Sequence, residues 1–221
     1  MAELSFWKIT GKDPERFLQG QLTVDVTRGI RCFCYCNAKA RVCTLGWVCR
    51  IDDDWYLAVP ELNAKSMFEA WKPYALFSSI QQKQMIDFGW EAAEELTIGP
   101  GLKSKTSWSE WAISQKIPII GPETRWRYTP HMISANLLAV DYDKGCYLGQ
   151  EIITRTEHLG KIKRQLITFR NLTIKNYIDQ EVTDSNGNKS GEVIFVGQEL
   201  SQAVVNIDNN YFIDGTELVL V

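Results

Sequence analysis

The part of the sequence best suited to chemistry is the segment 143–151, which reads Asp-Lys-Gly-Cys-Tyr-Leu-Gly-Gln-Glu. Two glycines bracket Cys146, so the backbone on either side can turn tightly and approach a ligand closely. The acid and the apolar residues after Gly149 predict a helix start, which would leave Cys146 before the positive end of a helix. With Lys144 two residues away, the segment favours a reactive thiolate. The residues alone leave a second interpretation equally open, a strand-to-helix turn around a buried, inert cysteine.

Five further cysteines lie close together near the N-terminus, at Cys32, Cys34, Cys36, Cys43 and Cys49. On a strand the first three would share one face about 6.6 Å apart, whereas tetrahedral zinc needs its sulfurs about 3.8 Å apart. The segment also contains no Cys-x-x-Cys pair. The spacing therefore predicts small apolar side chains in a buried hairpin rather than metal ligands. Direct iron binding by the first three stays open as an alternative.

The composition excludes several classes of protein. The chain has 221 residues, 24 of them basic and 27 acidic, a net charge of −3, and 45% hydrophobic residues, which is enough for one or two domains with a real core. The slight acidity argues against direct nucleic-acid binding, although it allows a local basic patch. No apolar run approaches the roughly 18–20 residues of a membrane span, and the N-terminus does not resemble an export signal. We therefore expect a cytoplasmic protein that does not associate with a membrane.

Hydrophobic periodicity and turn residues indicate the elements that position these groups. Strands are expected at 4–10, 31–36, 41–51 and 55–59, and helices from Asp13 and over about 61–72. Pro73 is expected to end the second helix, and strand character returns over 76–90. Beyond residue 160, short β-type runs with polar turns predict a small all-β sandwich or barrel.

Single aromatic residues and histidines give weaker indications. His131 and His158 are the only histidines. Either is a possible base, but a lone histidine more often packs or lies at the surface. Trp108, Trp111 and Trp126 are expected in the core rather than on a binding platform.

Segment 144–151 resembles the signature of the YgfZ family, the folate-binding relatives of the glycine cleavage T-protein. The residues that carry the signature are Lys144, Gly145, Cys146, Tyr147, Gly149, Gln150 and Glu151. The flanking segments 17–26, 37–42, 117–119, 128–130, 155–156 and 160–164 are also similar to the family. The resemblance implies an α+β fold of the T-protein type with a compact ferredoxin-like part and a small C-terminal β-barrel. It implies a folate-binding region over 1–160, with the ferredoxin-like part shortened within about 50–115, and the barrel over 161–221.

The function that the resemblance implies is that of a folate-binding accessory factor. It would support iron–sulfur cluster assembly or repair in cluster enzymes, including tRNA-thiomethylating radical enzymes. Its partners would be iron–sulfur enzymes or cluster-assembly proteins, and its cofactor a non-covalently bound tetrahydrofolate or one-carbon derivative. The catalytic candidates carried onto this sequence are Cys146 and Lys144. The candidates for folate contact are Asn37, Lys39, Arg41, Tyr147, Gln150 and Glu151, and no metal ligand is expected.

The sequence departs from the family pattern at informative positions. Ala40 stands where the family hairpin usually has glycine. The glycine cleavage T-protein, to which the family is related, looks to carry a pair of aspartates seven and eight residues after the asparagine that corresponds to Asn37. This chain has Thr44 and Leu45 at those positions. Without a carboxylate, true aminomethyltransferase activity is not expected. Two alternatives remain open: a one-carbon transferase that uses Cys146, and a non-catalytic protein-interaction scaffold.

Overall fold

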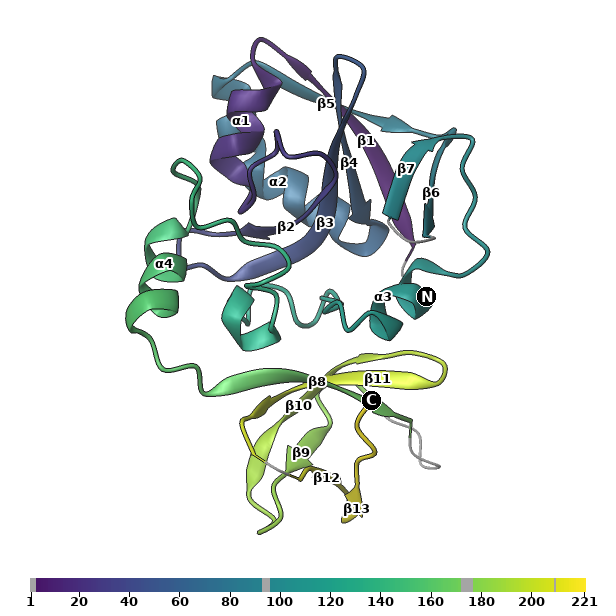
Figure 1. Cartoon of the computed structure of the whole chain (residues 1–221), viewed down its shortest axis with the longest axis vertical. Helices are drawn as coiled ribbons and strands as arrows, with labels where there is room; N and C mark the ends of the chain where they lie inside the picture. Colours follow the sequence, from purple (N-terminus) through teal and green to yellow (C-terminus); the bar gives the residue numbers. More distant parts are fainter. Residues whose placement is uncertain (1–2, 93–95, 172–176, 209) are drawn as a thin grey trace.

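The N-terminal sheet has the strand order β2-β3-β4-β1-β5, and all its neighbouring strands run antiparallel. The computed structural model describes residues 3–92, 96–171, 177–208 and 210–221. Helices α1 and α2 pack on one face of this sheet (Figure 1). The elements of this part are β1 (Leu4–Gly11), α1 (Pro14–Gln21), β2 (Arg31–Cys36), β3 (Val42–Ile51), β4 (Asp54–Pro60), α2 (Glu61–Phe77) and β5 (Ile80–Met85).

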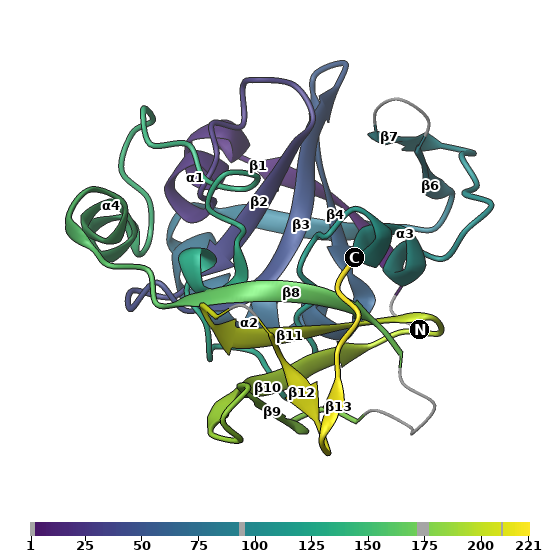
Figure 2. The same cartoon turned by 60° about the horizontal axis from the view of Figure 1, so that its bottom comes forward.

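The C-terminal sheet has the order β13-β12-β9-β10-β11-β8. Its strands are β8 (Arg164–Arg170), β9 (Glu181–Thr183), β10 (Lys189–Val196), β11 (Leu200–Asn206), β12 (Phe212–Ile213) and β13 (Thr216–Glu217). After β13 the chain returns to β8, where the Arg170 N–H donates to the Val219 carbonyl and the Val221 N–H to the Thr168 carbonyl, both at 3.0 Å. The return joins the two edges of the sheet, which therefore curls into a small barrel (Figure 2).

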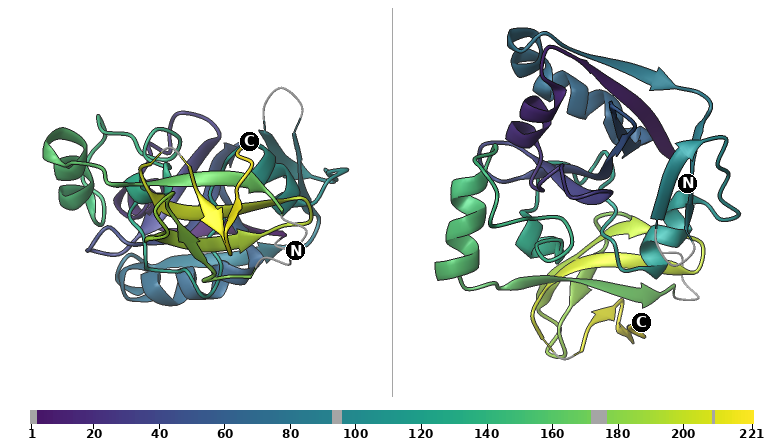
Figure 3. Two further views of the ribbon diagram at one scale, coloured as in Figure 1. Left: turned by 90° about the horizontal axis from the view of Figure 1, so that it is seen from below. Right: turned by 45° about the horizontal axis from the view of Figure 1, so that its top comes forward.

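A connecting stretch of short elements lies between the two sheets. Its elements are β6 (Phe88–Ala92), β7 (Leu96–Pro100), α3 (Trp108–Ser114), the 3₁₀ helix η1 (Pro130–Ile133) and α4 (Gln150–Leu159). Strands β6 and β7 form a separate two-stranded ladder beside the N-terminal sheet (Figure 3). The chain is thus a mixed α+β protein, whereas the division into domains at residue 160 stays a prediction.

The N-terminal sheet is buried on both faces. Phe33 and Tyr35 of β2 belong to the apolar cluster with α1 and α2, whereas Cys32, Cys34 and Cys36 belong to the cluster with α3, η1 and α4. Successive side chains of a strand point to opposite faces, so one strand supplies both clusters. This double burial explains why β2 and β3 are almost continuously apolar.

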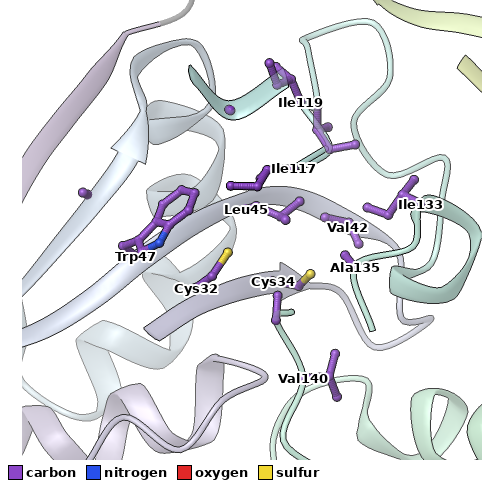
Figure 4. Packing of buried hydrophobic residues seen from close by; sticks show 14 of the residues in the cluster. Cys32, Cys34, Val42, Leu45, Trp47, Ile117, Ile119, Ile133, Ala135 and Val140 are labelled. Atoms are coloured by element: carbon purple, nitrogen blue, oxygen red, sulfur yellow. The ribbon is translucent and has the colours of Figure 1, made fainter. Parts of the chain in front are cut away.

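The clustered cysteines fill space in these cores. All five are at most 6% exposed, and Figure 4 shows the sulfurs of Cys32 and Cys34 among aliphatic side chains such as Leu45. Burial raises the pKa of Cys43 and of Cys49 to about 12, which keeps both as neutral thiols. The prediction of small apolar residues in a buried hairpin is confirmed.

The tryptophans are core residues as well. Trp108 is 2% exposed, and its ring centroid lies 4.4 Å from that of Trp47 and 5.6 Å from that of Trp90. Trp111 is partly buried against the same cluster, and Trp126 against the cluster of α1 and α2. The expectation of core packing for these residues is confirmed.

The predicted end of the second helix at Pro73 is wrong, because α2 continues to Phe77. Proline lacks the N–H that would meet the carbonyl of Glu69 four residues earlier. Glu69 is exposed, so water can hydrate that carbonyl. The strand expected over 76–90 accordingly begins only at Ile80.

One buried glutamine joins the barrel to the connecting stretch. The Gln202 side chain on β11 is fully buried; its Nε2 donates to the Ile117 carbonyl at 2.8 Å, and its Oε1 accepts from the Ile119 N–H at 3.0 Å. Both polar ends of the amide are therefore satisfied by backbone of the facing segment. This pairing fixes the barrel against residues 117–119.

The turn between β2 and β3 makes the contact that positions the signature. A Cβ added at Gly149 would lie 2.7 Å from the Asn37 carbonyl oxygen and 3.2 Å from the Ala40 Cα. Gly149 also has φ +85°, and Ala40 has φ +55°. The two turns therefore approach each other closely only because position 149 has no side chain.

We expect Gly149→Ala to lower the free energy of unfolding by about 2 kcal/mol or more, because the left-handed conformation and the close carbonyl both oppose a Cβ. Urea unfolding followed by tryptophan fluorescence measures the loss. Gly145→Ala is the matched control: a Cβ there meets nothing within 4 Å, so its effect is expected below about 0.5 kcal/mol. Equal losses in the two variants would contradict this account.

Candidate functional site

The signature forms a loop that leads into α4. Cys146 is exposed in this loop, and Gly149 is the N-cap of the helix. Glu151 lies exposed in the first turn of α4, and Gln150 is half-buried. The predicted helix start after Gly149 is confirmed.

Lys144 binds backbone rather than a carboxylate. Its Nζ donates to the carbonyls of Gln19, Leu22 and Val24, each at 2.8 Å. The ammonium also lies 5.1 Å from the centroid of the Tyr147 ring. Burial lowers the pKa of Lys144 to about 8, while Asp25 and Asp141 oppose that shift. Three carbonyl acceptors use all three N–H donors of the ammonium, so Lys144 holds the signature against the end of α1.

Ion pairs and a backbone hydrogen bond also attach the residues just before the signature to the segment between α1 and β2. Asp141 accepts from Arg31 at 2.6 Å and from the backbone N–H of Asp25 at 2.8 Å. Arg28 forms a two-pronged pair with Asp143, at 3.1 and 2.7 Å. The residues that precede Lys144 are thereby joined to the loop between α1 and β2.

Tyr147 turns inward beside Cys146. The ring is 7% exposed and belongs to the cluster of Cys34 and Cys36. Burial raises the pKa of Tyr147, which stays a neutral phenol. Its hydroxyl is buried and has no hydrogen-bond partner among the described residues. Such a hydroxyl is a candidate for binding a ligand or a water molecule.

The predicted hairpin residues differ in what they already contact. The Asn37 Oδ1 accepts from the N–H groups of Lys39 and Arg41, at 2.9 and 3.0 Å, so it stabilises the turn. The Arg41 guanidinium donates to the Arg127 carbonyl. Lys39 is exposed. The structure thus brings this turn against Gly149 of the signature, while the Lys144 ammonium points to another set of carbonyls.

A hydrogen-bonded cluster around the buried His131 was not predicted as a unit. His131 is 3% exposed, and its Nε2 lies 3.0 Å from the Glu157 Oε2. The Tyr142 hydroxyl donates to the same oxygen at 2.8 Å, and the Asn136 amide approaches it at 3.4 Å. Tyr142 precedes the signature and Glu157 lies about two turns into α4. Closeness to the signature in the sequence was therefore the available signal. The cluster ties α4 to η1.

No helix of the described residues is long and apolar enough to cross a membrane. Within the same residues, no group of three or more histidine, cysteine or acidic side chains is arranged to hold a metal ion.

Comparison with known proteins yields relatives along most of the chain, although no protein-family model matches it. An uncharacterized protein of Haemophilus influenzae Rd is 24% identical over 84% of this chain and 79% of its own length. The tRNA-modifying protein YgfZ of Colwellia psychrerythraea is 30% identical over 41% of this chain and 30% of its own length. A mitochondrial iron-sulfur cluster assembly factor IBA57 homolog of Dictyostelium discoideum is 31% identical over 37% of this chain and 22% of its own length.

Among solved structures, the glycine cleavage system aminomethyltransferase T of Bartonella henselae shares the fold. Its TM-score is 0.74 at 12% identity, over 98% of this chain and 82% of the other. The expected T-protein-like α+β fold is therefore confirmed. Further proteins named YgfZ match up to 75% of the chain. Together with the signature and its place in this fold, these similarities support the resemblance to the YgfZ family.

Proposed function

We propose that this chain is a folate-binding accessory factor that supports iron–sulfur enzymes, including enzymes that thiomethylate tRNA. Names of its relatives, a tRNA-modifying protein and an iron-sulfur cluster assembly factor, support this role. The observation that carries the folate part is the buried, unpartnered hydroxyl of Tyr147, two residues before the Gly149 that contacts the β2–β3 turn. Iron–sulfur enzymes or cluster-assembly proteins are the proposed partners, and the cytoplasm the proposed location.

The chemistry of the surrounding groups fits a folate. A pterin offers a flat ring with hydrogen-bonding edges, and the Tyr147 hydroxyl, the Gln150 amide and the Glu151 carboxylate are suited to such an edge. The glutamate tail is anionic, which suits the exposed ammonium of Lys39 and the guanidinium of Arg41. A bound tetrahydrofolate would supply a one-carbon carrier. The protein's own contribution is to bind and orient it beside Cys146.

Cys146 is the exposed thiol in this arrangement. The structure describes all six cysteines, and the other five are buried. A thiol that lies exposed at a ligand site can contact a partner protein or a cluster, and buried thiols cannot. We therefore assign the reactive role to Cys146.

Aminomethyl transfer of the T-protein type is not part of this proposal. Thr44 and Leu45, at the positions of the paired aspartates, are both buried. The Thr44 hydroxyl donates to the Leu45 carbonyl at 2.8 Å and accepts from the Asn63 amide at 3.4 Å. Neither side chain can accept or hold a proton as a carboxylate does.

We expect tetrahydrofolate to bind one to one in calorimetry, and Cys146→Ala to retain this binding because the thiol lies outside the proposed pterin contacts. The same variant should fail to restore a cluster-dependent enzyme, and thiomethylated tRNA, in cells that lack their own factor. Ser185→Ala, which also removes one heavy atom from an exposed residue, serves as the control and should restore both.

Three outcomes would count against this proposal. Absence of folate binding by the wild type would favour a protein-interaction scaffold. Turnover of a one-carbon folate that Cys146→Ala abolishes would favour a transferase. Equal rescue by wild type and Cys146→Ala would remove the role assigned to the thiol.

For Lys144 we propose a positioning role, since its ammonium is already held by three carbonyls. Lys144→Met should lower the free energy of unfolding by about 2 kcal/mol, because these carbonyls lose their donor. Lys161→Met, the same substitution at an exposed site, should change it by less than about 0.5 kcal/mol. Urea unfolding measures both values.

Alkylation of Cys146 separates positioning from direct activation of the thiol. If Lys144 only positions the signature, the pH profile for alkylation of Cys146 by iodoacetamide should have the same midpoint in Lys144→Met as in wild type. A midpoint displaced to higher pH in Lys144→Met, with stability unchanged, would instead show that the lysine acts on the thiol.

A further inference from the structure

The C-terminal end of α2 presents large apolar side chains to solvent. Phe77 is 94% exposed, Leu76 71% and Tyr74 46%. We call these three residues the α2 end. Single exposed apolar residues are ordinary, but three of them within four positions form a contiguous feature of the kind that marks an interaction surface.

Grooves flank the α2 end on both sides. One groove of about 730 Å³ lies between α1 and α2, with Phe17, Pro73, Tyr74 and Phe77 in its walls. Another of about 740 Å³ lies between α2 and strands β1 and β5 and includes Leu76. Both are large enough to accept anchoring side chains of a partner.

The cations around the α2 end are free to meet a partner. Lys12 and Arg16 line the first groove and Lys72 the second, and within the described residues none of the three forms an ion pair. Asp13, in the same turn as Lys12, caps α1 through its Oδ1. By contrast, Arg28 in the signature region is held by two carboxylates. The first groove is therefore locally basic, with Lys12 and Arg16 beside one carboxylate, Asp13. The second groove is balanced in charge, because Glu61 and Glu69 accompany Lys65 and Lys72.

We propose that the α2 end and its grooves are a docking surface for a partner-protein segment in which aromatic or aliphatic side chains lie among carboxylates. The apolar side chains of that segment would enter the grooves beside Phe77 and Tyr74. Its carboxylates would meet Lys12 and Arg16 at the first groove. This proposal goes beyond the folate-dependent role and does not depend on it.

Charge favours this occupant over two others. A second copy that docks through the first groove about a two-fold axis would bring Lys12 and Arg16 of both copies close together, which opposes association. An RNA strand gains its affinity mainly from many phosphate contacts, whereas the cations of the two grooves lie among the carboxylates of Asp13, Glu61 and Glu69, and the chain as a whole is acidic.

The first groove reaches the signature through α1. Gly20 lines the groove, and its carbonyl accepts from the Leu148 N–H at 3.1 Å. Lys144 binds the carbonyl of the neighbouring Gln19. A segment seated in the groove would thus lie against the helix to which the signature is attached.

The test uses fluorescein-labelled twelve-residue peptides of three compositions: acidic–apolar, basic–apolar, and acidic without apolar residues. Fluorescence polarisation with the full chain should show saturable binding of the acidic–apolar peptide, at least about tenfold tighter than the other two and weakened by salt. Phe77→Ser and the double variant Lys12→Glu, Arg16→Glu should each weaken it by about tenfold. Ile86→Ser is the matched control, because Ile86 is 93% exposed at the other end of β5 and should leave binding unchanged.

Each other outcome overturns the proposal. Absence of saturable binding, or equal binding by Phe77→Ser and Ile86→Ser, removes the surface. A labelled single-stranded RNA that binds wild type and is lost in Phe77→Ser assigns the surface to nucleic acid. A dimer in sedimentation analysis that Phe77→Ser dissociates assigns it to a second copy. Tetrahydrofolate should bind these variants as it binds wild type. Loss of peptide binding and loss of folate binding are thus measured separately, so failure of the docking proposal can be told from failure of the folate proposal.

Discussion

Burial of the N-terminal sheet on both faces is the constraint on which the rest of the structure depends. A sheet with one wet face could alternate apolar and polar residues, but β2 and β3 must supply apolar side chains in both directions. Cysteine at alternate positions of β2 meets this demand with a small apolar side chain on the face that packs against α3, η1 and α4. With α1 and α2 on one side, the connecting stretch and the barrel must occupy the other.

The signature is held to this framework by contacts with backbone. Lys144 binds three carbonyls, the Leu148 N–H binds one, and Gly149 allows close approach to a fifth, that of Asn37. Backbone acceptors are present whatever side chains stand at those positions. The signature can therefore dock on segments whose side chains show no pattern that would reveal the contact. These segments lie more than 100 residues earlier in the chain.

Local patterns in the sequence predicted most of the elements but few of the contacts between them. The Asp13 cap, the β2–β3 hairpin and the start of α4 follow from local residue types, and all are present. Pro73 failed as a helix stop because the lost hydrogen bond faces water, and exposure is a tertiary property.

The candidate site shows the same limit. Spacing placed Lys144 near Cys146, yet the ammonium turns to carbonyls 120 or more residues earlier in the chain. The cluster of His131, Tyr142 and Glu157 likewise joins residues from three segments. Such groupings depend on how the chain packs, so single-sequence spacing does not reveal them. The resemblance to the family located the signature but not these partners.

Helix α1 connects the two surfaces to which roles are assigned here. Its eight residues span roughly 12 Å. Lys12 and Arg16, at its start, lie in the groove beside the α2 end, and Gln19, near its end, binds Lys144 of the signature. A partner held at the groove would be kept within about one short helix of the signature while Cys146 stays exposed. Recognition of the partner and the role proposed for the thiol can then be changed independently by substitution, since one uses side chains at the groove and the other uses Cys146 in the signature loop.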